Sequence, residues 1–186
     1  MKTKWMNQVE TYDGTQLRGL RAYLELGLLG DSMVAWRGPC KISFEHMIDG
    51  EDLREKAAIE GSMMLHFIVE LFDQNLIAGV FFQRMIADHV RALIEEKASH
   101  RFHLVRQGDD LYWDGRKFSI SIATRAPNSV LVHFAINISN QGTPVPTCAL
   151  EDFGLEPEAL ALDLMERVSK EWLSIREATW KVLPAH

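Results

Sequence analysis

The chain has 186 residues, of which 47% are hydrophobic and 25% are charged. These ordinary values indicate neither a disordered nor a fibrous protein, and the length suits one domain, residues 1–186, with a full hydrophobic core. The balance of 20 basic and 26 acidic side chains gives a formal net charge of −6, which provides no general attraction for the phosphates of nucleic acid.

The first residues and the uncharged stretch are not expected to form a secretory signal or a membrane helix. Residues 1–8 lack the apolar core of a secretory signal, so we expect a cytoplasmic protein. Residues 126–150 contain no Asp, Glu, Lys or Arg, but three prolines and three asparagines make a membrane helix unsuitable there. We expect this stretch to be buried, to face a ligand or to form a homodimer interface.

The first half of the chain predicts helices and strands in alternation. Asp13 or Thr15 would cap a helix over residues 15–26, which Gly27 ends. Further along, the pattern predicts strands at 31–36 and 41–45 separated by an Arg37-Gly38-Pro39-Cys40 turn, a short helix at 49–59 and a strand at 62–72.

The second half contains the clearest periodicities. Apolar residues predict one helix over 75–97, and Pro157 begins another over 157–180. Between these helices, strands are expected near 102–104 and 111–113, and a hairpin of 118–123 and 130–138 turns at Pro127-Asn128. The pattern predicts an α+β fold, a mainly antiparallel sheet of six or seven strands with packed helices.

The predicted hairpin carries the polar groups of most interest. Phe118, Ile120 and Ile122 alternate with small or polar residues, which places Lys117 at the mouth of the strand. On the second strand, His133 and Asn137 share one face, where they are suited either to a ligand or to a satisfied place in the core.

These residues carry a resemblance to known families. The segment Asp110-Leu-Tyr-Trp-Asp-Gly-Arg-Lys-Phe-Ser resembles the part of lipoate-protein ligases and octanoyltransferases in which a turn presents the reactive-site lysine. Over nearly the whole chain, the sequence resembles the family called domain of unknown function 366, which implies a biotin/lipoate ligase and class II tRNA-synthetase-like fold. No activity is assigned to that family, so the local resemblance alone suggests a chemistry.

The resemblance to octanoyltransferases implies that Lys117 and Cys148, 31 positions apart, form a catalytic pair. A nearby ammonium lowers the pKa of a thiol, and the thiolate can then attack an acyl carbonyl while the lysine stabilises the oxyanion. The alternative is that Cys148 fills a gap in the core and Lys117 is a solvated turn residue.

A second local resemblance involves the acyl pocket of the same superfamily. Arg37-Gly38 followed by His46 resembles a segment that lines this pocket, although Pro39-Cys40 stands where the family has glycine and His46 falls two places later. Arg37 would then hold an anion, or else form a structural ion pair. The expected substrate-binding residues are thus Arg37, Gly38, His46, His133 and Asn137.

No metal site is expected, because His46, Asp49, His66 and His133 have no recognised short ligand spacing. There is no phosphate-binding loop either, so ATP with magnesium would be used only if the fold itself provides its site.

We therefore expect a small-molecule site that serves an acyl (lipoyl, octanoyl or biotinyl-like) transferase or ligase, with a free or carrier-protein-bound acyl substrate. Two alternatives remain open. The altered glycines suit a ligand-binding protein of the same fold without catalysis, and the uncharged stretch suits a dimeric interaction protein.

Overall fold

The computed structural model describes residues 1–56, 59–98, 101–141, 143 and 145–185. Its largest element is a five-stranded sheet in the order β1-β2-β3-β8-β7. The strands are β1 (Lys2–Trp5), β2 (Ser32–Ile42), β3 (Ile59–Phe72), β7 (Ser119–Arg125) and β8 (Ser129–Asn137). All neighbours are antiparallel except β1 and β2, which confirms the prediction of a mainly antiparallel sheet.

A small second sheet extends the end of the large one. It consists of β4 (Val105–Gln107), β5 (Asp110–Trp113) and β6 (Arg116–Lys117), all antiparallel. Asp114 and Gly115 join β5 to β6 with φ angles of 51° and 72°, as in the tight turns that suit an Asp-Gly pair. The described residues thus form eight strands in two sheets, rather than one sheet of six or seven.

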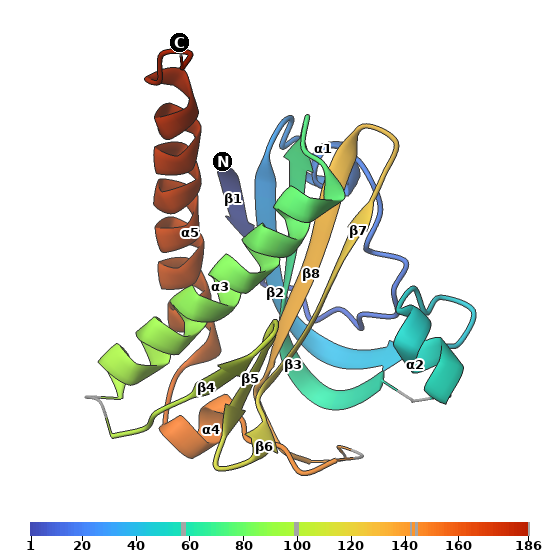
Figure 1. Cartoon of the computed structure of the whole chain (residues 1–186). Helices are drawn as coiled ribbons and strands as arrows, with labels where there is room; N and C mark the ends of the chain where they lie inside the picture. The colour runs from blue at the N-terminus through green and yellow to red at the C-terminus, as the bar shows by residue number, and fades with distance from the viewer. Residues whose placement is uncertain (57–58, 99–100, 142, 144, 186) are drawn as a thin grey trace.

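Two long helices cover one face of the large sheet, α3 (Leu76–Lys97) and α5 (Pro157–Trp180) (Figure 1). Asn75 caps α3, because its side chain accepts a hydrogen bond from the Ala78 amide at 2.9 Å. Beneath the helices lies the main core, to which Leu65, Phe67 and Phe134 contribute fully buried side chains. The predictions at 75–97 and 157–180 therefore agree with these helices within one residue.

The other face of the sheet is covered differently. The N-terminal segment, with α1 (Arg21–Leu26), and the short α2 (Gly50–Glu55) lie on this side (Figure 1). The helix expected at 15–26 is shortened because Leu20 adopts a φ of 64°, which no α-helix tolerates. The Glu70 carboxylate accepts the Leu20 amide at 2.9 and 3.0 Å, so a distant strand holds this conformation.

The turn expected at residues 37–40 is instead part of β2, which runs unbroken from Ser32 to Ile42. A bulge between Gly38 and Cys40 accommodates Pro39, which has no amide hydrogen to donate. The N-terminal segment pairs here, since the Tyr12 amide donates to the Pro39 carbonyl at 2.8 Å. Two expected strands therefore form one, and the short helix expected at 49–59 is Gly50–Glu55, with residues 57–58 outside the described part.

Three short elements were not predicted, β1, β6 and α4 (Leu150–Phe153). Each has at most four residues, too few to show a periodicity, and β1 forms by pairing with the distant β2. In addition, the strand expected at 118–123 begins at Ser119, and residues 116–117 belong to the small sheet.

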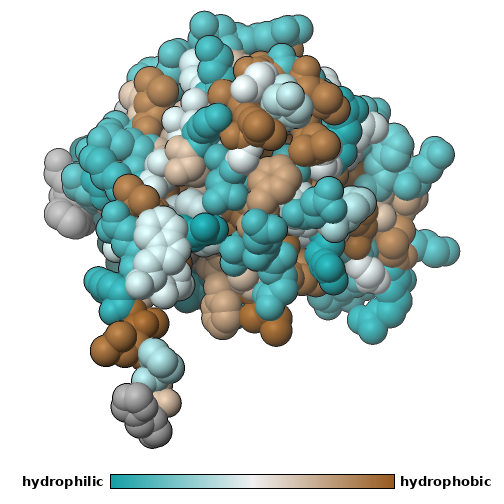
Figure 2. Space-filling model, turned by 90° about the horizontal axis from the view of Figure 1, so that it is seen from above, coloured by the Kyte–Doolittle hydropathy of each residue, from teal (hydrophilic) through white to brown (hydrophobic). Residues whose placement is uncertain are grey.

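Exposed apolar side chains occur near the end of the chain. Viewed from above, the C-terminal segment projects from the body of the molecule (Figure 2), and Val182 and Leu183 are 69% and 91% exposed.

Within the uncharged stretch 126–150, all of β8 is buried, whereas Gln141, Val145 and Pro146 are exposed and residues 142 and 144 lie outside the described part. No helix among the described residues has the length and apolar character needed to span a membrane.

Candidate functional site

A cavity of about 640 Å³ lies on the face of the sheet opposite α3 and α5. Strands β2, β3, β7 and β8 contribute to its floor, and the segment around α2 and the β5–β6 hairpin contribute to its walls. This size is typical of small-molecule sites. Its apolar lining residues include Tyr12, Leu17, Ile42, Met47, Ile59, Met64, Ile120, Ile122 and Val145.

The floor contains a stack of aromatic rings. The Tyr12 ring stacks on the His133 ring with centroids 3.7 Å apart, and the Trp36 ring lies 5.2 Å from that of His66. Tyr12 comes from the N-terminal segment, and the other three come from β2, β3 and β8. Their register places His66 beside Trp36, and Ala135 beside His66, on one face of the sheet.

Hydrogen bonds determine which nitrogen of each histidine carries the proton. The Gly38 carbonyl can only accept, so His66 donates to it from Nε2 at 3.0 Å. In neutral His66, Nδ1 then accepts from His133 Nε2 at 3.1 Å. The remaining ring nitrogen of His133, Nδ1, is consequently an acceptor on a residue that lines the cavity.

Both histidines are neutral near pH 7. Burial lowers the pKa of His66 to about 4, and burial followed by the proximity of His66 lowers the pKa of His133. The floor therefore offers hydrogen-bond acceptance without a positive charge.

Lys117 lies at the wall of the cavity, on the β5–β6 hairpin. Its Nζ is 2.7 Å from an Asp110 carboxylate oxygen, and its side chain is 32% exposed. Burial by itself disfavours the ammonium, but the hydrogen bond and charge of Asp110 outweigh it and raise the pKa of Lys117. Lys117 is thus a fixed cation and hydrogen-bond donor.

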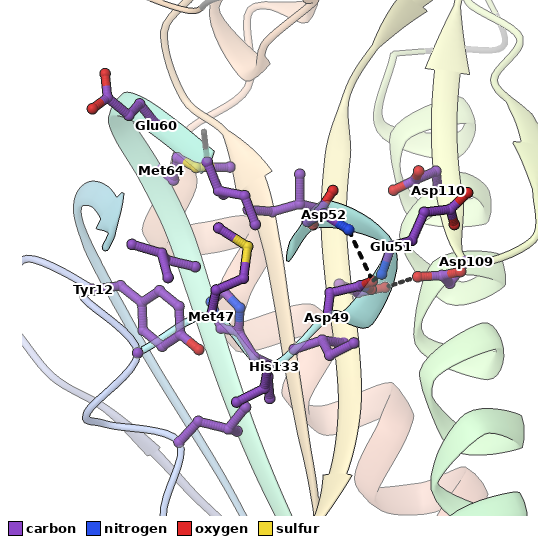
Figure 3. A pocket seen from close by; sticks show the side chains of 18 of the residues that line it. Tyr12, Met47, Asp49, Glu51, Asp52, Glu60, Met64, Asp109, Asp110 and His133 are labelled. Carbon is purple, nitrogen blue, oxygen red and sulfur yellow. Dashed lines mark hydrogen bonds between the residues drawn. The ribbon is translucent and has the colours of Figure 1, made fainter. Parts of the chain in front are cut away.

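Carboxylates dominate the charged lining of the cavity. Figure 3 shows Asp49, Glu51 and Asp52 on the same side as Asp109 and Asp110, away from Tyr12; these five residues are called the acidic wall below. With Glu55 and Glu60, seven carboxylates line the cavity, against the cationic side chains of Lys117 and Arg125 among the described residues.

Of the predicted site residues, Lys117, His46, His133 and Asn137 all line this cavity. His46 is exposed at its rim. Asn137 is buried, and its Nδ2 donates to the Lys117 and Cys148 carbonyls, both at 3.2 Å. It therefore holds the backbone of Lys117 in place and leaves ligand contact to its neighbours.

Arg37 is not among the residues that line the cavity. It pairs across the sheet with Leu65, a core residue of the helix-covered face, and side chains on directly paired residues share a face. Because Arg37 follows Trp36, whose side chain lies on the cavity side, alternation directs it away from the cavity. Arg37 therefore does not lie with Lys117, His46 and His133 in this cavity, and its role as an anion clamp stays a prediction.

Gly38 contributes through its backbone. Its carbonyl accepts from His66, and a Cβ placed on it would lie 1.8 Å from the Glu10 carbonyl oxygen. Only glycine allows the N-terminal segment to approach β2 this closely. Gly38 thus lies beneath the floor of the cavity, where it orients His66 and leaves room for the N-terminal segment, and it does not itself contact a ligand.

Cys148 is placed differently from the reactive thiol that the resemblance implies. It is fully buried in the main core, and burial raises its pKa to about 11. Its Sγ contacts the Arg116 carbonyl at 3.5 Å, and no hydrogen bond among the described residues joins it to the Lys117 ammonium. Backbone pairing does bring the two residues together, since the Cys148 amide donates to the Lys117 carbonyl at 3.0 Å, but the thiol packs in the core.

Sequence reasoning missed the aromatic stack and the acidic wall. Tyr12 lies in a segment without a ligand motif, Trp36 lies just before the Arg37-Gly38 segment and outside its resemblance, and the sequence suggests His66 only as a metal ligand. The carboxylates of residues 49–55 have the composition of a solvated helical turn. In the part of the chain that the structure describes, no group of three His, Cys, Asp or Glu side chains is arranged to share a metal ion.

Solved structures define the class of fold. A biotin protein ligase mutant of Aquifex aeolicus in complex with biotin matches 95% of this chain and 72% of its own, with a TM-score of 0.62 and 16% identity. Ta0514 of T. acidophilum, a putative lipoate protein ligase with bound lipoic acid, matches 94% and 87%, with a TM-score of 0.56 and 12% identity. The chain therefore has the biotin/lipoate ligase fold.

The family is shown by closer matches. A protein of unknown function from Pyrococcus horikoshi is 32% identical and matches all of both chains with a TM-score of 0.92. A family described as domain of unknown function (DUF366) matches residues 1–183, and this chain belongs to that family.

Proposed function

We propose that this protein is an acyltransferase that binds its acyl substrate in the cavity and uses Lys117 to stabilise the charge that develops on the acyl oxygen. One observation carries the proposal: a lysine held at 2.7 Å by Asp110 stands at a small-molecule-sized cavity on the open face of a ligase-like sheet. A fixed hydrogen-bond donor beside a desolvated site is what an oxyanion requires.

A carrier-bound thioester is the acyl donor that suits this site. When a nucleophile of the acceptor attacks the carbonyl carbon, its new bond replaces the C–S bond. The thiolate leaves and takes the proton that the nucleophile loses. Lys117 keeps its own proton throughout and donates a hydrogen bond to the acyl oxygen, in agreement with its raised pKa. No cysteine intermediate is required, which is consistent with the buried Cys148.

ATP fits the described lining poorly. Its triphosphate would lie among seven carboxylates, against two cationic side chains among the described lining residues, Lys117 and Arg125. Phosphate and carboxylate groups that share one cavity repel one another even at high effective dielectric constants. The proposed reaction therefore does not use ATP.

The test is product formation by the purified full chain. Octanoyl, lipoyl and biotinyl thioesters of a carrier protein are incubated with the chain and a lysine-rich acceptor peptide, and products are detected by intact mass. Lys117→Met should lower the rate by roughly 10²-fold, by analogy with loss of an oxyanion donor. Lys41→Met, at an exposed lysine of β2 outside the cavity lining, and Cys148→Ala should retain the wild-type rate.

Two results would change the conclusion. Product formed only from free acid with ATP and magnesium would replace the transferase by a ligase. No product from any donor, together with ligand binding that Lys117→Met leaves intact, would favour a binding protein without catalysis.

A further inference from the structure

Two members of the acidic wall have side-chain partners: Asp110 is paired with Lys117, and Asp109 accepts hydrogen bonds from Gln83 and Ser121. The other three, Asp49, Glu51 and Asp52, have no Lys or Arg partner within ion-pair distance among the described residues; the hydrogen bonds that Asp49 accepts come from the backbone amides of Glu51 and Asp52. Burial, followed by the charge of Asp49, raises the pKa of Asp52. Neighbouring carboxylates of this kind are stabilised when a cation binds between them.

A hydrogen-bond acceptor on the floor of the cavity also favours a ligand that carries N–H groups. His133 is 2% exposed, and its Nδ1 has no hydrogen-bond partner among the described residues. Since His66 and Gly38 fix the tautomer, this nitrogen is an acceptor. An acceptor that faces the cavity and has no partner among the described residues favours a ligand that donates a hydrogen bond to it.

The apolar residues of the lining indicate the kind of group that the rest of the ligand carries. Ile42, Met64 and Ile120 belong to an apolar cluster on this face or pack against it, so the cavity offers apolar walls next to a negatively charged one. A ligand therefore meets apolar side chains and carboxylate acceptors, together with the cationic donors Lys117 and Arg125.

We propose that the cavity selects a ligand with an apolar body and a protonated nitrogen, an ammonium or amidinium group, which the acidic wall binds. The proposal rests on the proposed function in one respect: it assumes that the cavity is where the acyl substrate binds, so the preferred acyl group carries this nitrogen, and the neutral octanoyl, lipoyl and biotinyl thioesters are poorer donors. It differs from what the solved ligase complexes bind, since biotin and lipoic acid are the ligands in those structures and neither carries an ammonium group.

The test compares three probes of equal chain length, hexylamine, hexanol and hexanoate, binding to the full chain at pH 7 and low salt, measured by calorimetry or ligand-observed NMR. We expect hexylamine to bind at least about 10-fold more tightly than hexanoate, with hexanol between them, and the preference to weaken with added salt. Hexanoate binding as tightly as hexylamine would overturn the proposal.

Variants locate the effect. Glu51→Gln/Asp52→Asn should reduce the preference for the amine by about 10-fold. Glu171→Gln/Glu177→Gln removes the same charge from exposed positions on α5 and should leave the preference unchanged. An equal effect of both double variants would overturn the proposal, because it would show that net charge alone attracts the probe. Binding of Mg²⁺ alone, with no binding of hexylamine, would also overturn it.

Failure of this inference and failure of the proposed function can be told apart. Amine binding that survives in a protein without transferase activity removes only the acyl transfer. Thioester turnover lost in Lys117→Met, together with equal binding of the three probes, removes only the cationic ligand.

Discussion

The two faces of the large sheet use the same strands for different purposes. On the face under α3 and α5, Phe67 and Phe134 pair directly across β3 and β8 and are fully buried. One residue away in the same pair of strands, the other face carries His66 and His133. The helix-covered face contributes stability through apolar burial, whereas the cavity face contains buried polar groups that cost free energy unless they have partners.

The polar groups of the cavity face find partners in chain segments far away in sequence. Glu70, which is 4% exposed, accepts from the Leu20 amide and from the Ser129 hydroxyl at 2.7 Å. Such an arrangement is expensive to build by comparison with an apolar layer, because each donor and acceptor must be matched.

The largest effect is expected on the helix-covered face. Phe134→Ala should lower the free energy of unfolding by about 3–5 kcal/mol, because it removes a fully buried ring and leaves a cavity. Chemical denaturation measures this loss. Phe44→Ala, at a phenylalanine that is 54% exposed, should change stability by less than about 0.5 kcal/mol. Similar losses in both variants would contradict the assignment of this face as the main core.

A smaller loss is expected beneath the cavity floor. Gly38→Ala would place a methyl group against the Glu10 carbonyl, which should cost roughly 1–3 kcal/mol of stability. It should also weaken probe binding, since the Gly38 carbonyl orients His66. Gly50→Ala is the matched control, because nothing lies within 4 Å of the added methyl group. Equal stability of the two variants would show that the N-terminal segment does not pack on β2 in solution.

The smallest effect, counted per histidine and per pH unit, is expected when the pH is lowered. His66 and His133 are held neutral, with pKa values below that of an unfolded histidine, about 6.5. The unfolded chain therefore takes up protons first as the pH falls, and the stabilisation present above pH 6.5 is lost progressively toward pH 4.

Each histidine should lower the free energy of unfolding by up to about 1.4 kcal/mol per pH unit in this window. Denaturation at pH 7, 6 and 5, combined with NMR titration of the ring protons, checks the slope and its origin. Ring signals of both residues that titrate near pH 6.5 in the folded protein would contradict the buried, tautomer-fixed pair.

Local patterns in the sequence determined the elements that depend on neighbouring residues. The apolar period of α3, Pro157 at the start of α5 and the alternation in the β7–β8 hairpin each predicted an element. They also placed Lys117 at a strand mouth and His133 with Asn137 on one face. These features follow from the 3.6-residue and two-residue repeats, which are properties of a contiguous segment.

Only the tertiary structure decided what lies opposite those residues. It placed the Cys148 thiol in the core, directed Arg37 away from the cavity and brought Tyr12, Trp36 and His66 to His133. It also converted a charged helical turn into part of an acidic wall that faces Lys117. These outcomes depend on which distant segments pack together and on the free energy of burying each side chain against its particular partners, and neither is contained in the periodicity of any one segment.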